Sequence, residues 1–242
     1  MKARVHSIET FGTVDGPGIR YVAFMQGCDF RCRYCHNPDT WNCHGGEEMS
    51  LDQILEDVQK YKRYIQGVTL SGGEPLLQLE FVIELFTRLK NMGFDTCVDT
   101  SGQVFDNNDE KIKKDIDKMF KVCDYILLDI KHIDDDKHKW LTGKSNKCVL
   151  DFAKYADSKK KTLWLRYVLV PGVNDDEDSL RKWKAFADSL KNVEKIELLP
   201  YHKMAITKYE KLGIKYTLTD TNEPTKEQID FAKKILEIKG EE

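Results

Sequence analysis

The 242-residue chain lacks the features that mark membrane proteins, exported proteins and general nucleic-acid binders. It has no run of 18 apolar residues, so the sequence predicts no membrane-spanning helix. Its first residues, MKARVHSIETFG, contain no apolar signal-peptide core, and export is therefore not expected. Its 38 Lys and Arg against 41 Asp and Glu give a net charge of −3, which argues against nucleic-acid and membrane-surface binding. We therefore expect a soluble, cytoplasmic protein.

The chain also lacks a linker rich in proline, glycine or serine, and no low-complexity tract divides it. With 40% hydrophobic and 33% charged residues, it has the composition of an ordinary globular protein. A chain of this length buries roughly 70–75% of its unfolded surface and needs no disulfide bonds to be stable. The sequence therefore predicts a single domain over residues 1–242, in which the polar stretches 105–114 and 133–138 are loops.

Short apolar and β-branched runs alternate with amphipathic stretches of helical period. The expected strands are Arg20–Met25, Gly67–Leu70, Asp95–Asp99, Tyr125–Asp129, Thr162–Val170 and Lys195–Leu199. The expected helices are Ser50–Ile65, Gln78–Asn91, Asp109–Phe120, Asn146–Lys159, Asp178–Leu190 and Thr225–Lys239, with Ser50 as the N-cap of the first. This alternation predicts an α/β protein whose parallel sheet is either open or closed into a barrel.

Polar, charged or glycine-rich residues follow each of the six expected strands. The strands run into CDFRCRYCHN, SGGE, DTSG, LDIK, VPG and LPYH. In parallel α/β proteins, functional sites assemble at the carboxyl ends of the strands. The sequence therefore predicts one rim that carries Cys28, Cys32, Cys35, Gly72, Gly73, Glu74, Asp99, Asp129, Lys131, Arg166 and His202.

Three of the seven cysteines, Cys28, Cys32 and Cys35, fall within eight residues. The spacing CxxxCxxC brings three thiolates to one loop, which suits an iron–sulfur cluster or zinc. An odd number of cysteines without an export signal argues against a disulfide framework. Structural zinc needs a fourth ligand, which Cys43 or His44 can supply. A cubane cluster held by three thiolates instead keeps one iron open for a small chelating ligand, and the residues alone leave both interpretations open.

CDFRCRYCHN, followed about one strand–helix unit later by SGGE, resembles the signature of the radical S-adenosylmethionine (SAM) superfamily. Further segments are similar to the family of activating enzymes of glycyl radical enzymes: HSIETFGTVDGPGIR, CHNPDTW, HGG, SGGEPLLQ, DTSG, LLDIKH, RYVLVPGVNDD and VEKIELLPYH, in that order. The resemblance runs from about His6 to His202, with a looser match beyond. It implies a partial (β/α)6 barrel, a [4Fe–4S] cluster and SAM as co-substrate. In this family, SAM is cleaved reductively to methionine and a 5′-deoxyadenosyl radical, which takes a hydrogen atom from a glycine of the target enzyme.

The resemblance also assigns roles to individual residues. Cys28, Cys32 and Cys35 match the cluster ligands, on which the catalytic chemistry depends. The positions that match SAM contacts are Tyr34, Cys35, His36, Gly72, Gly73, Glu74, Asp99, Asp129, Ile130, Lys131, Arg166 and His202. A monovalent cation, Na⁺ or K⁺, is implied beside the SAM carboxylate at Asp99, Thr100, the Leu127 carbonyl and Asp129. The segment Asp15–Gly18 matches a region near the substrate peptide.

Cys43 is the only cysteine between Cys35 and Gly72. The chain therefore has no room there for the ferredoxin-like insertion of many such activating enzymes, because each added cluster needs four thiolates. This favours pyruvate formate-lyase as the protein substrate over dehydratase- or decarboxylase-type glycyl radical enzymes. The family further implies reduced flavodoxin or ferredoxin as electron donor, an anaerobic setting and a monomer. Two alternatives stay open: a radical SAM enzyme with another target, and a non-catalytic zinc or electron-transfer module.

Overall fold

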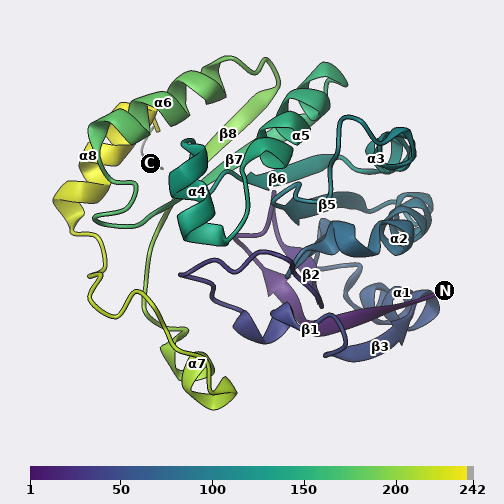
Figure 1. Ribbon diagram of the computed structural model, residues 1–242. Coiled ribbons are helices and arrows are strands. Elements are labelled where there is room, and N and C mark those ends of the chain that lie inside the picture. Colours follow the sequence, from purple (N-terminus) through teal and green to yellow (C-terminus); the bar gives the residue numbers. More distant parts are fainter. Residues whose placement is uncertain (239–242) are drawn as a thin grey trace.

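The computed structural model describes residues 1–238, and its centre is one eight-stranded sheet in the order β3-β1-β2-β4-β5-β6-β7-β8 (Figure 1). The strands are β1 (Lys2–Gly12), β2 (Arg20–Met25), β3 (Glu47–Ser50), β4 (Gly67–Gly72), β5 (Asp95–Thr100), β6 (Tyr125–Asp129), β7 (Thr162–Leu169) and β8 (Val193–Pro200). From β2 to β8 neighbouring strands are parallel. The six parallel strands confirm the predicted (β/α)6 arrangement. The barrel is partial, because within the described residues the sheet ends at β8 and does not close onto β3.

Helices connect the parallel strands and cover the outer side of the curved sheet (Figure 1). They are α1 (Leu51–Tyr61), α2 (Leu79–Asn91), α3 (Glu110–Val122), α4 (Asp135–Thr142), α5 (Lys147–Ser158), α6 (Glu177–Asp188), α7 (Ile206–Leu212) and α8 (Lys226–Leu236), with short 3-10 turns η1 (Pro38–Trp41) and η2 (Pro75–Gln78). The six expected helices correspond to α1, α2, α3, α5, α6 and α8. As predicted, the Ser50 side chain caps α1 by accepting from the Gln53 amide at 3.2 Å. The last helix ends at Leu236, and Lys239 lies outside the described residues.

Four elements were not expected from the sequence. Two are strands, β1 and β3, which extend the parallel sheet by antiparallel pairing. Ala3 and Val5 of β1 are buried and residues 6–11 of β1 alternate between half-buried and exposed positions, whereas β3 has no buried residue. Both strands lack the apolar runs of the other strands. The other two are the short helices α4 and α7. The prediction of a loop over 133–138 was wrong, because the Asp134 carboxylate caps α4 by accepting from the amides of Asp136 and Lys137.

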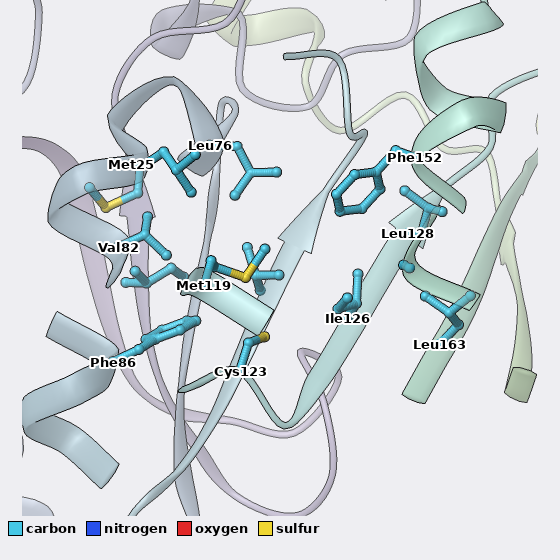
Figure 2. Close-up of a cluster of buried hydrophobic side chains, with 14 of the residues drawn as sticks. Met25, Leu76, Val82, Phe86, Met119, Cys123, Ile126, Leu128, Phe152 and Leu163 are labelled. Carbon is cyan, nitrogen blue, oxygen red and sulfur yellow. The ribbon is translucent and has the colours of Figure 1, made fainter. Parts of the chain in front are cut away.

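The main core lies between the sheet and its outer helices. Figure 2 shows Val82 and Phe86 of α2, Met119 of α3 and Ile126 of β6 in one cluster of buried side chains. Each of these four is fully buried, and burial of one such side chain contributes about 1.5–3 kcal/mol. This core fixes the strands, and therefore the loops that follow them. No helix over residues 1–238 combines the length and the apolar character that a membrane crossing requires.

Candidate active site at the carboxyl ends of the strands

The cysteine loop follows β2 and is held in place by the end of α4. The amides of Arg31 and Arg33 donate to the carbonyls of Thr142 and Leu141, at 2.8 and 2.9 Å. Within the loop, the Cys35 amide donates to the Cys32 carbonyl at 3.0 Å. Two backbone hydrogen bonds from alternate residues thus fix the segment between the first and last cysteine.

Burial sets the chemistry of the three thiols. Desolvation, with a further contribution from the Glu74 carboxylate, raises the pKa of Cys28 to about 11. Desolvation likewise raises the pKa of Cys32 and Cys35 above the ordinary thiol value. A nucleophilic cysteine needs a lowered pKa, so these thiols are not suited to nucleophilic catalysis. They are suited to metal ligation, in which the metal itself displaces the proton.

The Gly-Gly-Glu turn after β4 is packed against the end of β2. The Gly73 amide donates to the Met25 carbonyl at 2.9 Å, and the Glu74 amide donates to the Gly27 carbonyl at 2.8 Å. A Cβ atom at Gly73 would lie 2.2 Å from the Gly27 carbonyl oxygen, so only glycine fits there. The turn is thereby joined to the strand end that leads into the cysteine loop.

Glu74 is fully buried and joins the ends of β4 and β5. Its carboxylate accepts from the hydroxyls of Thr100 and Ser101 and from the Ser101 amide. Burial nevertheless raises the pKa of Glu74 above the ordinary value. The Glu74 side chain therefore positions the DTSG turn and does not line the cavity.

A cavity of about 480 Å³ opens at this rim, within the range of small-molecule sites. Thirteen of the sixteen predicted site residues line it: Cys28, Cys32, Tyr34, Cys35, His36, Gly72, Gly73, Asp99, Thr100, Asp129, Lys131, Arg166 and His202. The exceptions are Glu74, Leu127 and Ile130, all fully buried. The Ile130 carbonyl accepts from the Trp183 indole at 3.2 Å, and Leu127 packs with Cys97 and Trp164.

Two ion pairs cross the floor of the cavity. Lys131 Nζ lies 2.7 Å from Asp129 Oδ2, and Arg166 Nη1 lies 2.9 Å from Asp99 Oδ2. Desolvation opposes charge on Asp129, but the Lys131 ammonium and the Arg166 guanidinium hold the pKa of Asp129 below its usual value. The Asp129 charge in turn raises the pKa of Lys131 against the effect of burial. Two carboxylate side chains and two cationic side chains are thus paired with each other across the floor.

Several buried polar atoms of the cavity have no hydrogen-bond partner among residues 1–238. They are Asp99 Oδ1, His36 Nε2, His202 Nδ1 and Arg166 Nε. The rings of His36 and His202 stack at 3.9 Å, and burial together with the neighbouring His202 lowers the pKa of His36 to about 4. Buried polar groups are normally paired. An acceptor, a guanidinium donor and two stacked imidazole rings fit a zwitterionic ligand that also carries a heteroaromatic ring.

The cavity lining also includes residues that were not predicted as site residues, among them three polar side chains next to predicted ones. Ser71 donates to Asp99 Oδ2 at 2.6 Å, and Ser101 belongs to the turn that Glu74 holds. Asp15 also lines the cavity, and desolvation with the nearby Asp99 charge raises the pKa of Asp15 to about 6. Both serines stand inside SGGE and DTSG, so those motifs carried the signal that identifies them. Asp15 was expected only as part of the segment near a substrate peptide.

A preformed zinc site is not found among the described residues. Over residues 1–238, no group of three or more His, Cys, Asp or Glu side chains is arranged to hold a metal ion. Cys43, one of the proposed fourth ligands, is exposed to solvent. A four-iron cubane places each thiolate on a different iron, so its ligands stand around the cluster and need not converge on a point.

Comparison with known proteins defines the class. Residues 22–183, from β2 into α6, match the radical SAM superfamily, and the chain therefore belongs to it. The fold agrees: a radical SAM methyltransferase from Sphaerobacter thermophilus superposes with a TM-score of 0.64 at 18% identity, over 90% of this chain and 63% of that one. Membership implies SAM and a [4Fe–4S] cluster.

Within the superfamily the match is more specific. The pyruvate formate-lyase-activating enzyme of Listeria monocytogenes is 47% identical over 97% of this chain and 96% of its own length. That of Staphylococcus aureus is 46% identical over 99% and 97%. A domain of the corresponding Bacteroides vulgatus enzyme has a TM-score of 0.56 at 27% identity, over 71% of this chain and 92% of that domain. The chain belongs to the family of pyruvate formate-lyase-activating enzymes.

Proposed function

We propose that this chain activates pyruvate formate-lyase by generating a glycyl radical on it, with a [4Fe–4S] cluster on Cys28, Cys32 and Cys35 and SAM in the adjoining cavity. The observation that supports this most directly is the convergence of three thiols, one buried and two half-buried, and two ion pairs on one cavity at the carboxyl edge of the sheet. The named relatives, which align over nearly the whole chain, supply the target.

When bound, the cluster and SAM supply the one-electron chemistry that removes a hydrogen atom from a glycine. The chain's own residues bind and orient SAM and shield the reaction site from water. Asp129 and Asp99 offer carboxylates to the ammonium and hydroxyl groups of SAM, and Lys131 and Arg166 offer cations to its carboxylate. Because these side chains are fixed to one another before SAM binds, little reorganisation is needed on binding. Gly72 and Gly73 leave the backbone open to close approach by the ligand.

A monovalent cation, Na⁺ or K⁺, is proposed between Asp99, Thr100, the Leu127 carbonyl and Asp129. The support is the buried Asp99 Oδ1, which has no partner over residues 1–238, and the register that sets Asp99 of β5 beside Leu127 of β6. Hard oxygen ligands suit such an ion.

The proposal includes a reduced flavodoxin or ferredoxin as electron donor, a single domain, a monomer and a cytoplasmic, anaerobic setting. The setting follows from chemistry, because a cluster with an open iron reacts with oxygen. Light scattering on the reconstituted protein tests the monomer directly, and a dimer mass would contradict it.

The test is electron paramagnetic resonance on anaerobically reconstituted, reduced protein, first alone, then with SAM, then with pyruvate formate-lyase. We expect a reduced-cluster signal that SAM changes, followed by a glycyl-radical doublet on the added enzyme. A signal that responds to SAM without the doublet would retain radical SAM chemistry and exclude this target. Zinc in place of iron would refute the mechanism.

Single serine substitutions test the ligand assignment. We expect Cys28→Ser, Cys32→Ser and Cys35→Ser each to lose the [4Fe–4S] signal and SAM cleavage together, because an open-iron cluster needs all three thiolates. Cys43→Ser is the matched control: Cys43 is exposed, close to the loop in sequence, and absent from the cavity lining. Retention of a wild-type cluster by any of the three variants would overturn the assignment.

A further inference from the structure

One polar side chain outside the SAM cavity reaches a proposed cluster ligand. Gln103 follows the DTSG turn after β5, and Gln103 Nε2 donates to Cys28 Sγ at 3.6 Å. Gln103 does not line the cavity that holds the predicted SAM contacts, but it lines a neighbouring hollow of about 410 Å³. The proposed chemistry gives this side chain no role, although it touches one of the three sulfurs that would hold the cluster.

The backbone on both sides of Gln103 is held in place. The Gly102 amide donates to Thr100 Oγ1 at 2.9 Å, and the Thr100 hydroxyl donates to the buried Glu74 carboxylate. On the other side, the Phe105 amide donates to the Gly102 carbonyl at 3.0 Å, and the Phe105 ring is buried. None of these contacts uses the Gln103 side chain, so a substitution at Gln103 should leave the turn intact.

The Gln103 amide is directed at Cys28. Within residues 1–238, Nε2 donates to Cys28 Sγ and to no other side chain, and the buried Oε1 has no hydrogen-bond partner. A sulfur that ligates iron is a thiolate, which accepts hydrogen bonds and has no proton to donate. The N–H side of the amide is therefore the side that a ligating Cys28 would attract, and an amide turned the other way would repel it.

Hydrogen bonds to the sulfurs are among the factors that set the reduction potential of an iron–sulfur cluster. A low-potential one-electron reductant adds one electron to the cluster, and no bond forms or breaks in this step. The added negative charge is shared with the ligating sulfurs. An N–H donor on such a sulfur therefore stabilises the reduced state more than the oxidised state, and it raises the potential.

We infer that Gln103 is a positioning residue that acts through Cys28: by donating a hydrogen bond from Nε2 to Cys28 Sγ, it raises the reduction potential of the [4Fe–4S] cluster. This role rests on the proposed function, because it requires a cluster on Cys28, Cys32 and Cys35. The potential then depends on a side chain that lies about 70 residues beyond the cysteine loop in the sequence and reaches it only through the packing of the strand ends.

A redox titration of the anaerobically reconstituted protein, followed by electron paramagnetic resonance, measures the potential. We expect Gln103→Leu, which removes the donor but keeps a side chain of similar size, to lower the ratio of reduced to oxidised cluster roughly tenfold at a fixed solution potential. For a one-electron couple, this places the midpoint potential about 59 mV lower. Asn107→Leu is the matched control, because Asn107 is an exposed amide on the wall of the same hollow and forms no hydrogen bond with Cys28. Its potential should equal that of wild type.

Two charged variants distinguish this contact from a general disturbance of the structure. Gln103→Glu places a carboxylate against the Cys28 sulfur and should lower the potential further than Gln103→Leu. Gln103→Lys keeps an N–H donor and adds positive charge, so it should raise the potential above that of wild type. A disturbance of the loop alone would shift both variants in the same direction. Asn107→Glu and Asn107→Lys place the same charges on the wall of the hollow without the contact, and we expect clearly smaller shifts from them.

The outcomes separate the two proposals. If wild type assembles no redox-active cluster, the proposed function fails. If wild type assembles one, and Gln103→Leu and Gln103→Glu keep its potential, the role of Gln103 is refuted. If Gln103→Leu assembles no cluster, the Glu and Lys variants decide: shifts in opposite directions support the role, and shifts in the same direction refute it.

Discussion

Gly72 has a backbone φ of +110°, and a Cβ atom there would lie 2.3 Å from the Met25 amide nitrogen. Two separate effects therefore require glycine: the left-handed conformation and the close approach of β2. The SGGE motif was enough to predict this position as a site residue, but the clash with Met25 follows only from the pairing of β2 with β4.

Alanine substitutions separate these two effects. Gly172 also has a left-handed φ, +75°, but a Cβ atom added there would meet no other atom within 4 Å. We expect Gly172→Ala to lower the free energy of unfolding by about 1–2 kcal/mol, the cost of the left-handed conformation. Gly72→Ala should lose clearly more and should also abolish SAM binding. Urea denaturation followed by circular dichroism measures the difference, and equal losses would contradict the steric argument.

Asp15 makes the stability of the folded protein depend on pH, and the raised pKa of Asp15 fixes the sign of that dependence. Desolvation raises the pKa of Asp15 from 3.8 to about 6 in the folded protein. The folded state therefore holds this proton more tightly than the unfolded state, so stability falls as pH rises from about 4 to about 6 and stays lowered above that. Asn mimics the protonated acid and removes this loss.

We accordingly expect Asp15→Asn to be more stable than wild type at pH 7.5, and the difference to shrink towards pH 4.5. Urea denaturation of cluster-free protein at the two pH values is the measurement. A variant that is less stable than wild type at pH 7.5 would show that Asp15 is not a destabilised carboxylate.

At the scale of the elements, α4 is a short polar helix that could not be predicted from the sequence. Residues 133–138 are mostly charged and have no helical apolar period, yet the segment after Asp134 is helical. The apolar contact that fixes it comes from the buried Leu141, which lies beyond the polar stretch, and the buried Thr142 hydroxyl donates to the His138 carbonyl at 2.9 Å. The acidic residues Asp134 and Asp135 have defined roles, because Asp134 caps α4 and Asp135 accepts from Ser145.

The Asp134 cap predicts a measurable contribution to stability. We expect Asp134→Ala to lower the free energy of unfolding by about 1 kcal/mol, the usual value for a lost N-cap. Asp136→Ala is the control, since the side chain of Asp136 is 95% exposed and makes only a surface ion pair with Lys139. Its loss should stay within about 0.5 kcal/mol. Thermal unfolding of both variants measures the two losses of stability. Equal losses would show that the Asp134 cap does not stabilise α4.

The strands and main helices were predictable because each has a clear apolar period, and the rim was predictable because six polar strand ends occur in order. The strands β1 and β3 were not, since neither has a continuous apolar run: most positions of β1 are exposed or half-buried, and β3 is a short edge strand with no buried residue. Glu74 shows the same limit in the site: its motif was recognised, but only the packing of β4 beside β5 reveals that its carboxylate holds Ser101.

At the scale of the whole molecule, one buried cation spans the interior of the sheet. Arg20 is fully buried, pairs with Asp95, and donates to Thr69 Oγ1 at 3.0 Å and to the Pro17 carbonyl at 3.1 Å. Thr69 in turn donates to the Asp15 carbonyl at 2.6 Å. Arg20 therefore ties β2, β4 and β5 to the loop that presents Asp15.

Removal of this cation should affect the whole fold. We expect Arg20→Met to lower the free energy of unfolding by about 3 kcal/mol, because partners of a buried charge are left unsatisfied. Arg181→Met on α6 is the control: Arg181 pairs with Glu177 at the surface, where such a pair contributes about 0–1 kcal/mol. Chemical denaturation of the two variants measures the two losses in the free energy of unfolding. A small loss for Arg20→Met would show that water replaces the contacts of Arg20.

The gap beside β8 has a consequence for how the protein behaves among its own copies. An unpaired strand edge invites strands of other chains, which is a route to aggregation. Of the eight residues of β8, three are charged, Glu194, Lys195 and Glu197, and Lys195 lies 2.8 Å from Glu197. Charge on such an edge discourages strand pairing between molecules. The strand at which the barrel stays open thus also carries the charges that discourage such pairing.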